Sequence, residues 1–368
     1  MRIVYCADFI YPNDIGGSAR YAYDLLRGLV LIGVEVFLIT RARSNKELAA
    51  GTERLGALVG NNRYFEIGGP WQLIRFSRMV SDQDIIVAHH PVLGLALSVL
   101  CPYNHVYYFF HGPYHEEFRS ATGIGRRSIR YQMKKIAQLL VLLRSKVIFV
   151  LSEFMKSQVE SLGIKKTTEV IGPVLDRSKF NSRSSWSTSH KSGKKRLITV
   201  RRLTPRTGVL ELIDWFSVLD PDQYELFIVG TGDLEAQVQD KARSVRNVFP
   251  QGYVDDHDLS ALLADSDLFI LPSRELEGFG LVILESFALG VPVIASDRSG
   301  GGADFLEALD KNLIFSYERA MVEFPKAVLY ALYSFDKSGL RRIAARYTPE
   351  GTARKLLRVL VGEAPCPR

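Results

Sequence analysis

Residues 266–295 hold the densest group of side chains that could do chemistry. Glu277 and Glu285 stand eight residues apart, the first ahead of a helix predicted over 281–289 and the second just over one turn inside it. This spacing prevents an adjacent acid/base pair on one helical face, but it lets the carboxylates hold different parts of one long ligand. Between them, 278–281 offers free backbone N–H groups at a helix N-terminus, which suits a phosphate. The alternative is a capped helix whose Glu277 only complements the helix dipole.

A second candidate is His111, which follows a predicted strand over 106–110 and precedes a Gly-Pro turn. Open α/β sheets bind ligands at loops beyond the carboxyl ends of their strands. His111 is therefore placed where a loop enters a binding cleft. His89 and His90 follow a similar strand and are rivals, and each of the three could be an ordinary loop histidine. His115 and His257 are interpreted as bystanders.

The elements that must position these residues follow from short apolar runs that alternate with helical patterns. This alternation predicts parallel sheets covered by helices on both faces. The predicted strands lie at 3–7, 34–40, 85–89, 106–110 and 146–151, and again at 197–200, 225–230, 268–271 and 291–295. The predicted fold class is α/β, with two Rossmann-like, doubly wound parallel-sheet domains and an inter-domain cleft.

A stretch rich in serine at 182–193 interrupts the alternation and indicates a linker. We place the first domain at 1–175, the linker at 176–196 and the second domain at 197–349. A helical pattern at about 350–368 could pack back on the first domain.

Composition excludes several classes of protein. With 368 residues, 47% hydrophobic and 24% charged, the chain has a globular composition and room for two or three domains. Cys6, Cys101 and Cys366 lack the spacing of a disulfide framework or a zinc site. No apolar run is long enough for a membrane span or a signal peptide, so we expect a cytoplasmic protein.

The net charge of +7 lies in the first half and indicates an anionic partner there, or only a solvated basic face. The basic, amphipathic stretch 125–146 could lie on an anionic bilayer, peripheral to the inner face of the cytoplasmic membrane. The alternative is a surface helix with its apolar stripe on the sheet. Nucleic acid is not expected, because aromatic and basic residues are not interleaved.

Several segments together resemble GT-B glycosyltransferases of the retaining family 4 type, which includes bacterial polysaccharide and lipid-linked sugar transferases. The resemblance covers nearly the whole chain. It rests on the two glutamates around Gly-Phe-Gly within 266–295, the strand and glycine turn at 226–232, the nucleobase loop at 251–254, the run at 264–269 and the loop at 8–18.

The resemblance implies a retaining, metal-independent transfer of a hexose without a cofactor. The donor would be a nucleotide sugar, UDP-glucose or a related one. The acceptor hydroxyl would belong to a saccharide or a lipid-linked sugar in cell-surface or exopolysaccharide biosynthesis.

The resemblance also implies roles for individual residues. Glu285 would hold the ribose hydroxyls and Glu277 the hydroxyls of the transferred sugar, with Glu275 as a competitor for the second role. His111 would contact the sugar and help stabilise the transition state. The remaining donor-binding residues would be Gly17, Gly230, Tyr253, Val254, Phe279, Gly280 and Leu281.

One departure from the family pattern concerns the Arg and Lys that clamp the diphosphate. Arg202 matches the arginine, but Thr207 stands where the lysine is expected. A leaving diphosphate develops negative charge, which a positioned cation stabilises. Arg206 is the candidate substitute, and the alternative is that Arg206 points to solvent.

Other functions compete with this interpretation. A UDP-sugar 2-epimerase-like isomerase shares the two-domain plan, and a non-catalytic nucleotide-sugar-binding protein is also open. An NAD enzyme is disfavoured because Glu235 stands at the third glycine of the dinucleotide fingerprint. Asp-X-Asp occurs four times, including Asp265 and Asp267, so that motif alone does not indicate a catalytic metal.

Overall fold

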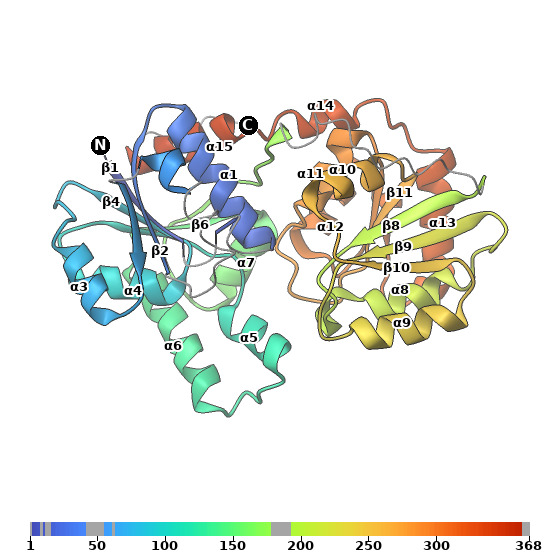
Figure 1. Ribbon diagram of the computed structural model, residues 1–368, viewed down its shortest axis with the longest axis horizontal. Helices are drawn as coiled ribbons and strands as arrows, with labels where there is room; N and C mark the ends of the chain where they lie inside the picture. The colour runs from blue at the N-terminus through green and yellow to red at the C-terminus, as the bar shows by residue number, and fades with distance from the viewer. Residues whose placement is uncertain are drawn as a thin grey trace. The chain divides into compact units, whose positions relative to one another are not determined.

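The structure is a computed structural model that describes residues 2–7, 10–11, 16–41, 55–60, 63–177 and 193–362. The chain divides into two compact units, Met1–Val174 with Tyr347–Arg368 (unit 1) and Leu175–Arg346 (unit 2). Each unit is a parallel sheet flanked by helices, as Figure 1 shows. The prediction of two doubly wound α/β domains is confirmed.

Within the described residues, unit 1 forms a seven-stranded sheet in the order β3-β2-β1-β4-β5-β6-β7. Its inner strands are mostly buried apolar runs, as expected for parallel strands covered on both faces, whereas the two edge strands are largely half-buried. They are β1 (Arg2–Cys6), β2 (Glu35–Arg41), β3 (Tyr64–Ile67), β4 (Ile85–Ala88), β5 (Val106–Phe109), β6 (Val147–Val150) and β7 (Thr168–Val170). The helices are α1 (Gly17–Leu31), α3 (Pro70–Ser77), α4 (Pro91–Leu100), α5 (Tyr114–Thr122), α6 (Ile129–Arg144), α7 (Glu153–Ser161) and α15 (Pro349–Leu360).

The last helix of the chain, α15, packs on α1 within unit 1. Its apolar face is buried, including Leu356 and Leu360. A Cβ on Gly28 of α1 would lie 2.1 Å from the carbonyl oxygen of Pro349, so only glycine lets the two helices approach this closely.

Unit 2 forms a six-stranded sheet from its described residues, in the order β10-β9-β8-β11-β12-β13. The strands are β8 (Lys195–Val200), β9 (Tyr224–Val229), β10 (Val248–Gly252), β11 (Leu268–Leu271), β12 (Val293–Ser296) and β13 (Ile314–Phe315). The helices are α8 (Val209–Phe216), α9 (Glu235–Ser244), α10 (Asp256–Ala264), α11 (Val282–Leu289), α12 (Gly300–Leu309), α13 (Ala320–Tyr333) and α14 (Leu340–Ala344), with 3₁₀ turns η4 (Pro205–Thr207) and η5 (Lys311–Leu313).

The structure differs from the predicted boundaries at three points. Leu175, predicted as the last residue of the first domain, already belongs to unit 2. Lys195 and Arg196 pair with β9 and begin β8, although the predicted linker extended to 196. Tyr347 already belongs to unit 1, although the second domain was predicted to reach 349. The serine-rich residues 182–192 lie outside the described residues.

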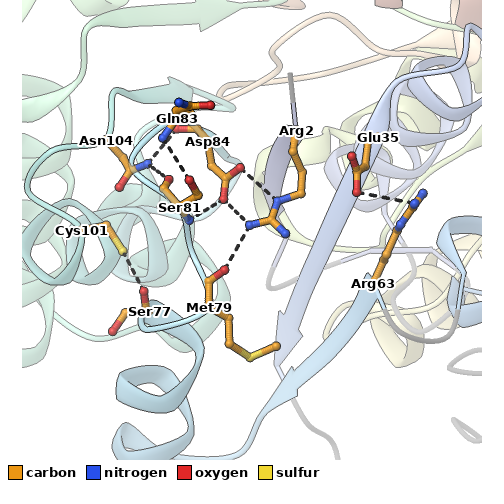
Figure 2. A network of polar contacts seen from close by, with 10 residues as sticks. All are labelled: Arg2, Glu35, Arg63, Ser77, Met79, Ser81, Gln83, Asp84, Cys101 and Asn104. Carbon is orange, nitrogen blue, oxygen red and sulfur yellow. Dashed lines mark hydrogen bonds and ion pairs between the residues drawn. The ribbon is translucent and has the colours of Figure 1, made fainter.

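A network of polar contacts joins the amino end of β1 to the segments just before β4 and β5 (Figure 2). Arg2 donates through Nε to Oδ1 of Asp84 at 3.0 Å and through Nη2 to the carbonyl of Met79 at 3.1 Å. The backbone N–H of Ser81 donates to Asp84, and the side-chain amide of Asn104 donates to the carbonyls of Ser81 and Asp84. These contacts hold the amino ends of β1 and β4, at the edge opposite the strand-end loops that bind ligands in such sheets.

The apolar stripe of α6 faces away from the rest of unit 1. The side chains that α6 buries are on another face, which includes Gln138, Val141 and Leu142. The interpretation of a surface helix with its apolar stripe on the sheet is therefore wrong. The exposed apolar residues are Ile129, Met133, Ile136, Leu140 and Leu143, with between 41% and 77% of each exposed.

None of the helices in the described ranges has the length and apolar character to cross a bilayer.

Candidate functional site

The carboxyl edge of the unit 2 sheet gathers most of the predicted donor-binding residues. Arg201 follows β8, Gly230 follows β9, Tyr253 follows β10 and the loop that carries Glu277 follows β11. Because these four strands are parallel neighbours, their carboxyl ends meet at one edge of the sheet. The N–H of Arg201 donates to the carbonyl of Val229, which ties two of these loops together.

Glu277 is held in place by two side chains. The guanidinium of Arg201 donates through Nη2 to Oε2 of Glu277, and the hydroxyl of Ser273 donates to the same oxygen at 3.2 Å. The side chain of Arg201 is 8% exposed and that of Glu277 is 14% exposed. No described residue makes a hydrogen bond to Oε1 of Glu277, so this oxygen keeps its capacity to accept from a ligand.

The charge of Glu277 is set by two opposing effects. Burial raises the pKa of its carboxyl, whereas Arg201 and Arg206, together with the Ser273 hydrogen bond, lower it. The lowering effects win, so the pKa lies below its usual value and the carboxylate is ionised at neutral pH.

Arg206 lies against the same loop. Its Nη1 donates to the carbonyl of Leu276 at 3.1 Å, and its own carbonyl accepts from the N–H groups of Arg274 and Glu275. Leu276 has a φ of 59°, a left-handed conformation that is costly for a leucine, so the loop must be held in this shape by its neighbours. The side chain of Arg206 does not simply point to solvent, as one interpretation of the sequence held.

Arg201 is the residue that sequence reasoning missed. Arg202, which matches the arginine of the family pattern, is exposed, whereas Arg201 reaches Glu277. Two adjacent arginines give no sequence signal that tells which one faces the loop. Thr207 is buried and its hydroxyl donates to the carbonyl of Thr204, so it closes the η4 turn.

Glycine at 230 is required by the close approach of two loops. Gly230 has a φ of 130°, and a Cβ there would lie 1.8 Å from the carbonyl oxygen of Arg201. Two of the predicted residues around α11 are buried: Phe279 packs against Phe305, and Glu285 lies in the first turn of the helix. Phe279 can therefore offer a ligand its backbone rather than its ring.

The remaining predicted residues lie as follows. Gly280 has a φ of 77° just before α11, and Leu281 is the residue at the N-terminus of that helix. Tyr253 is exposed and Val254 is half-buried after β10. Gly17 begins α1 in unit 1, where a Cβ would meet no atom of the described residues within 4 Å.

A cavity in unit 1 contains the predicted His111. It is lined by Ser18, His89, His90, Pro91, Tyr108, His111, Gly112, Tyr114 and Glu117. The rival histidines are joined rather than separate, since Nδ1 of His89 lies 2.9 Å from Nε2 of His111. Burial lowers the pKa of His111 to about 4 and that of His89 well below its usual value, so both rings are neutral at pH 7.

Gln138 of α6 holds the loop that follows His111, and sequence reasoning missed it as well. Its Oε1 accepts from the N–H of Tyr114 at 3.0 Å, and its Nε2 donates to the carbonyl of Gly112 at 2.7 Å. Nδ1 of His115 lies 3.3 Å from the same Oε1. A glutamine inside an apolar helix gave no signal of this role.

Asp265 and Asp267 belong to an ion-pair network at the amino edge of the unit 2 sheet. Lys195 donates to Asp267 at 2.8 Å, and Arg196 contacts Asp265 at 2.6 Å and Glu225 at 3.0 Å. This edge is opposite the strand-end loops of unit 2. The two carboxylates therefore fix strand ends rather than approach the Glu277 loop.

Models of known protein families match both units of the chain. A family model described as "Glycosyltransferase Family 4" matches residues 15–179, and one described as "Glycosyl transferases group 1" matches 180–332. HepE of Anabaena in complex with UDP has a TM-score of 0.75 at 16% identity, covering 98% of this chain and all of that one, which shows a shared fold.

Two curated relatives match over shorter segments. The amylovoran biosynthesis glycosyltransferase AmsK of Erwinia amylovora is 31% identical over 118 residues, 28% of each protein. Phosphatidyl-myo-inositol mannosyltransferase of Mycobacterium leprae is 36% identical over 107 residues, 28% of this chain and 29% of that protein. The chain thus matches less than a third of the length of these two relatives.

The two family models follow one another along the chain and divide it near the boundary between unit 1 and unit 2. The chain therefore belongs to the group 1 glycosyltransferases of the family 4 type, with the GT-B fold.

Proposed function

We propose that the protein is a retaining glycosyltransferase that moves a hexose from a nucleotide sugar to an acceptor hydroxyl without a metal ion. The observation that carries the proposal is Glu277, an ionised and nearly buried carboxylate with one oxygen fixed and the other available. A carboxylate oxygen held in this way is suited to accept from a sugar hydroxyl.

In this proposal, different residues of unit 2 bind different parts of the donor. Oε1 of Glu277 accepts from the hydroxyls of the sugar, and Glu285 from those of the ribose. The backbone N–H groups of 279–281 meet the donor beside Glu277. UDP-glucose is the first donor to test, because HepE, which shares the fold, has been solved with UDP and with UDP-glucose.

The bond between the sugar and the diphosphate breaks and leaves an oxocarbenium-like sugar. The acceptor oxygen forms its bond to the same carbon on the vacated face, and its proton passes to an oxygen of the departing diphosphate. Negative charge grows on the leaving diphosphate, and Arg202 and Arg206 are the cations that would neutralise it. His111 contributes from the unit 1 cavity by contacting the sugar.

Nucleotide-sugar binding is tested by thermal unfolding against a panel that includes UDP-glucose and GDP-mannose, since a ligand of the folded state raises the unfolding temperature. A positive ligand is then assayed for release of its nucleotide with and without saccharide and lipid-linked acceptors. Release that requires an acceptor supports transfer. Conversion of the sugar without an acceptor indicates an isomerase, and binding with no turnover indicates a non-catalytic protein.

We further propose that α6 docks the protein on an anionic bilayer at the inner face of the cytoplasmic membrane. Its exposed apolar stripe runs along the whole helix, from Ile129 to Leu143. Exposed or partly exposed cations flank the stripe: Arg126, Arg127, Arg130, Lys134, Lys135 and Arg144. Apolar insertion together with attraction of cations to anionic lipids is the physical basis of interfacial helix binding.

A membrane location also fits the acceptor we propose, a lipid-linked saccharide in cell-surface or exopolysaccharide biosynthesis. The M. leprae relative is named as a mannosyltransferase of phosphatidyl-myo-inositol, a lipid. A docked α6 would bring unit 1 to the surface where such acceptors lie.

A further inference from the structure

The pair of histidines in the unit 1 cavity has an asymmetric environment. The ring of His89 stacks on Phe109 at 4.4 Å between centroids and lies 4.7 Å from the ring of Tyr5. Its Nδ1 makes the contact with Nε2 of His111. Its other nitrogen, Nε2, is buried and has no hydrogen-bond partner among the described residues.

This asymmetry decides which ring donates in the hydrogen bond. A neutral imidazole carries one N–H and one bare nitrogen. If His111 donated through Nε2, the proton of His89 would be on its own Nε2, where a buried N–H would find no acceptor in the described part of the chain. If His89 donates through Nδ1, only a bare nitrogen stays unpaired. An orphaned buried N–H is the rarer arrangement in native proteins, which favours donation by His89.

His111 then carries its proton on Nδ1, the ring nitrogen that does not contact His89. When Nε2 of His111 accepts from His89, the proton of His111 must be on Nδ1. The described residues offer no hydrogen-bond partner to Nδ1 of His111, which belongs to a residue lining the cavity.

We propose that His89 is a positioning residue that fixes His111 in the tautomer with its proton on Nδ1, so that His111 offers an N–H donor to an oxygen of the ligand in the cavity. Only the identity of that ligand, a sugar hydroxyl, rests on the function proposed above. In this tautomer His111 can bind an oxygen but cannot take a proton from an acceptor hydroxyl through Nδ1. His111 is thereby a binding and stabilising group rather than a general base.

The tautomer is measured directly by nuclear magnetic resonance on the full chain with ¹⁵N-labelled histidine. Long-range ¹H–¹⁵N correlations show which ring nitrogen carries the proton, and the signals of His111 are those lost in the His111→Gln variant. We expect a proton on Nδ1 of His111 and on Nδ1 of His89. A proton on Nε2 of His111 would overturn the proposal, and this result does not depend on any sugar nucleotide.

Two substitutions at His89 test its control of the tautomer. His89→Asn keeps an N–H donor close to the position of Nδ1, and His89→Asp places only acceptor oxygens there. We expect His111 to keep its tautomer in the first variant and to carry its proton on Nε2, donated to the carboxylate, in the second. The exposed His257→Gln should leave the signals of His111 unchanged. An unchanged tautomer in His89→Asp contradicts the role of His89, and if that variant does not fold, the wild-type spectrum and His89→Asn still decide.

A binding measurement separates this inference from the proposed function. The affinity for UDP-glucose relative to UDP should fall about fivefold or more in His89→Asp and change little in His89→Asn, since His111 loses its Nδ1–H donor to the sugar only in the first. If the wild-type protein binds neither UDP-glucose nor the other nucleotide sugars of the panel, the proposed function fails while the tautomer result stands. If the wild-type protein prefers UDP-glucose and both variants match it, the functional part of this inference fails.

Discussion

Arg201 donates to the carboxylate of Glu277, and both side chains are nearly buried. This ion pair keeps the carboxyl of Glu277 charged, whereas burial alone would tend to neutralise it. It also uses one oxygen of Glu277 and leaves the other for a ligand.

Replacing Arg201 by Met should therefore make sugar recognition depend on pH. In the wild-type protein the pKa of Glu277 lies below its usual value, so the affinity for UDP-glucose relative to UDP should be constant from about pH 5.5 to 8. Without Arg201, burial raises the pKa, and the relative affinity should fall as the pH drops toward the new value. Calorimetric titrations across this range check the effect, and Arg201→Lys should restore part of it. A flat profile in Arg201→Met would contradict the account.

Arg201→Met should also lower the free energy of unfolding by about 3 kcal/mol, because it removes the ion-pair partner of the nearly buried carboxylate of Glu277. Arg298→Met is the matched control, since Arg298 pairs with the largely exposed Glu318 and such surface pairs contribute less than about 1 kcal/mol. Urea denaturation measures the free energy of unfolding of both variants. The contribution of Glu277 should be present at neutral pH and lost as the pH falls below the usual carboxyl range, because its pKa is lowered in the folded state. Equal effects of the two substitutions would argue against a special role for the Arg201 pair.

Arg206→Ala should reduce turnover at least about tenfold, which corresponds to about 1.4 kcal/mol. Arg206 contacts the strained loop through Leu276 and contributes positive charge near Glu277. Steady-state release of the nucleotide measures the loss. Arg243→Ala, which removes an arginine with a 77% exposed side chain, should be neutral. Near-normal turnover of Arg206→Ala would remove Arg206 from the site.

Replacing Ile136 by Asn on α6 should weaken binding to anionic vesicles about tenfold, since one large apolar side chain no longer inserts. Leu329→Asn is the control, because Leu329 is similarly exposed but lies on α13. Sedimentation with phosphatidylglycerol vesicles measures the difference, and binding should weaken as salt is added. Equal recovery with neutral vesicles, or no effect of Ile136→Asn, would count against docking through α6.

Gly28→Ala should destabilise unit 1 by about 1–3 kcal/mol, because the new methyl group would collide with the carbonyl of Pro349 and separate α15 from α1. A methyl group in Gly125→Ala would meet no atom of the described residues within 4 Å and should have little effect. Thermal or urea unfolding compares the two. Wild-type stability of Gly28→Ala would mean that the close approach of α15 to α1 is not required.

The parts of the fold that sequence predicts well are those set by local pattern. The apolar runs that form β1, β5 and β11 predict buried parallel strands, and the loop with Glu277 falls at a strand end for the same reason. Whether a helical side chain faces solvent or the core is harder to predict. Helical periodicity shows that α6 has apolar residues, but it does not show that Ile136 faces outward while Val141 packs inward.

The contacts that sequence could not predict join distant segments. Arg201 and Glu277 are 76 residues apart, and nothing in either segment encodes their pairing. His89 and His111 were rivals for one role, whereas the sheet places β4 beside β5 and so brings the ends of both strands together. Strand order, which sequence left open, decides both relationships.

The central claim is that Glu277 recognises the sugar of the donor while Glu285 recognises its nucleotide. Calorimetric titration of Glu277→Gln and Glu285→Gln with UDP-glucose and with UDP tests it most directly, and the exposed Glu307→Gln is the control. The account predicts that Glu277→Gln loses most of the preference for UDP-glucose over UDP and keeps its affinity for UDP, while Glu285→Gln weakens both ligands alike. Unchanged affinities for both ligands in both variants would contradict it.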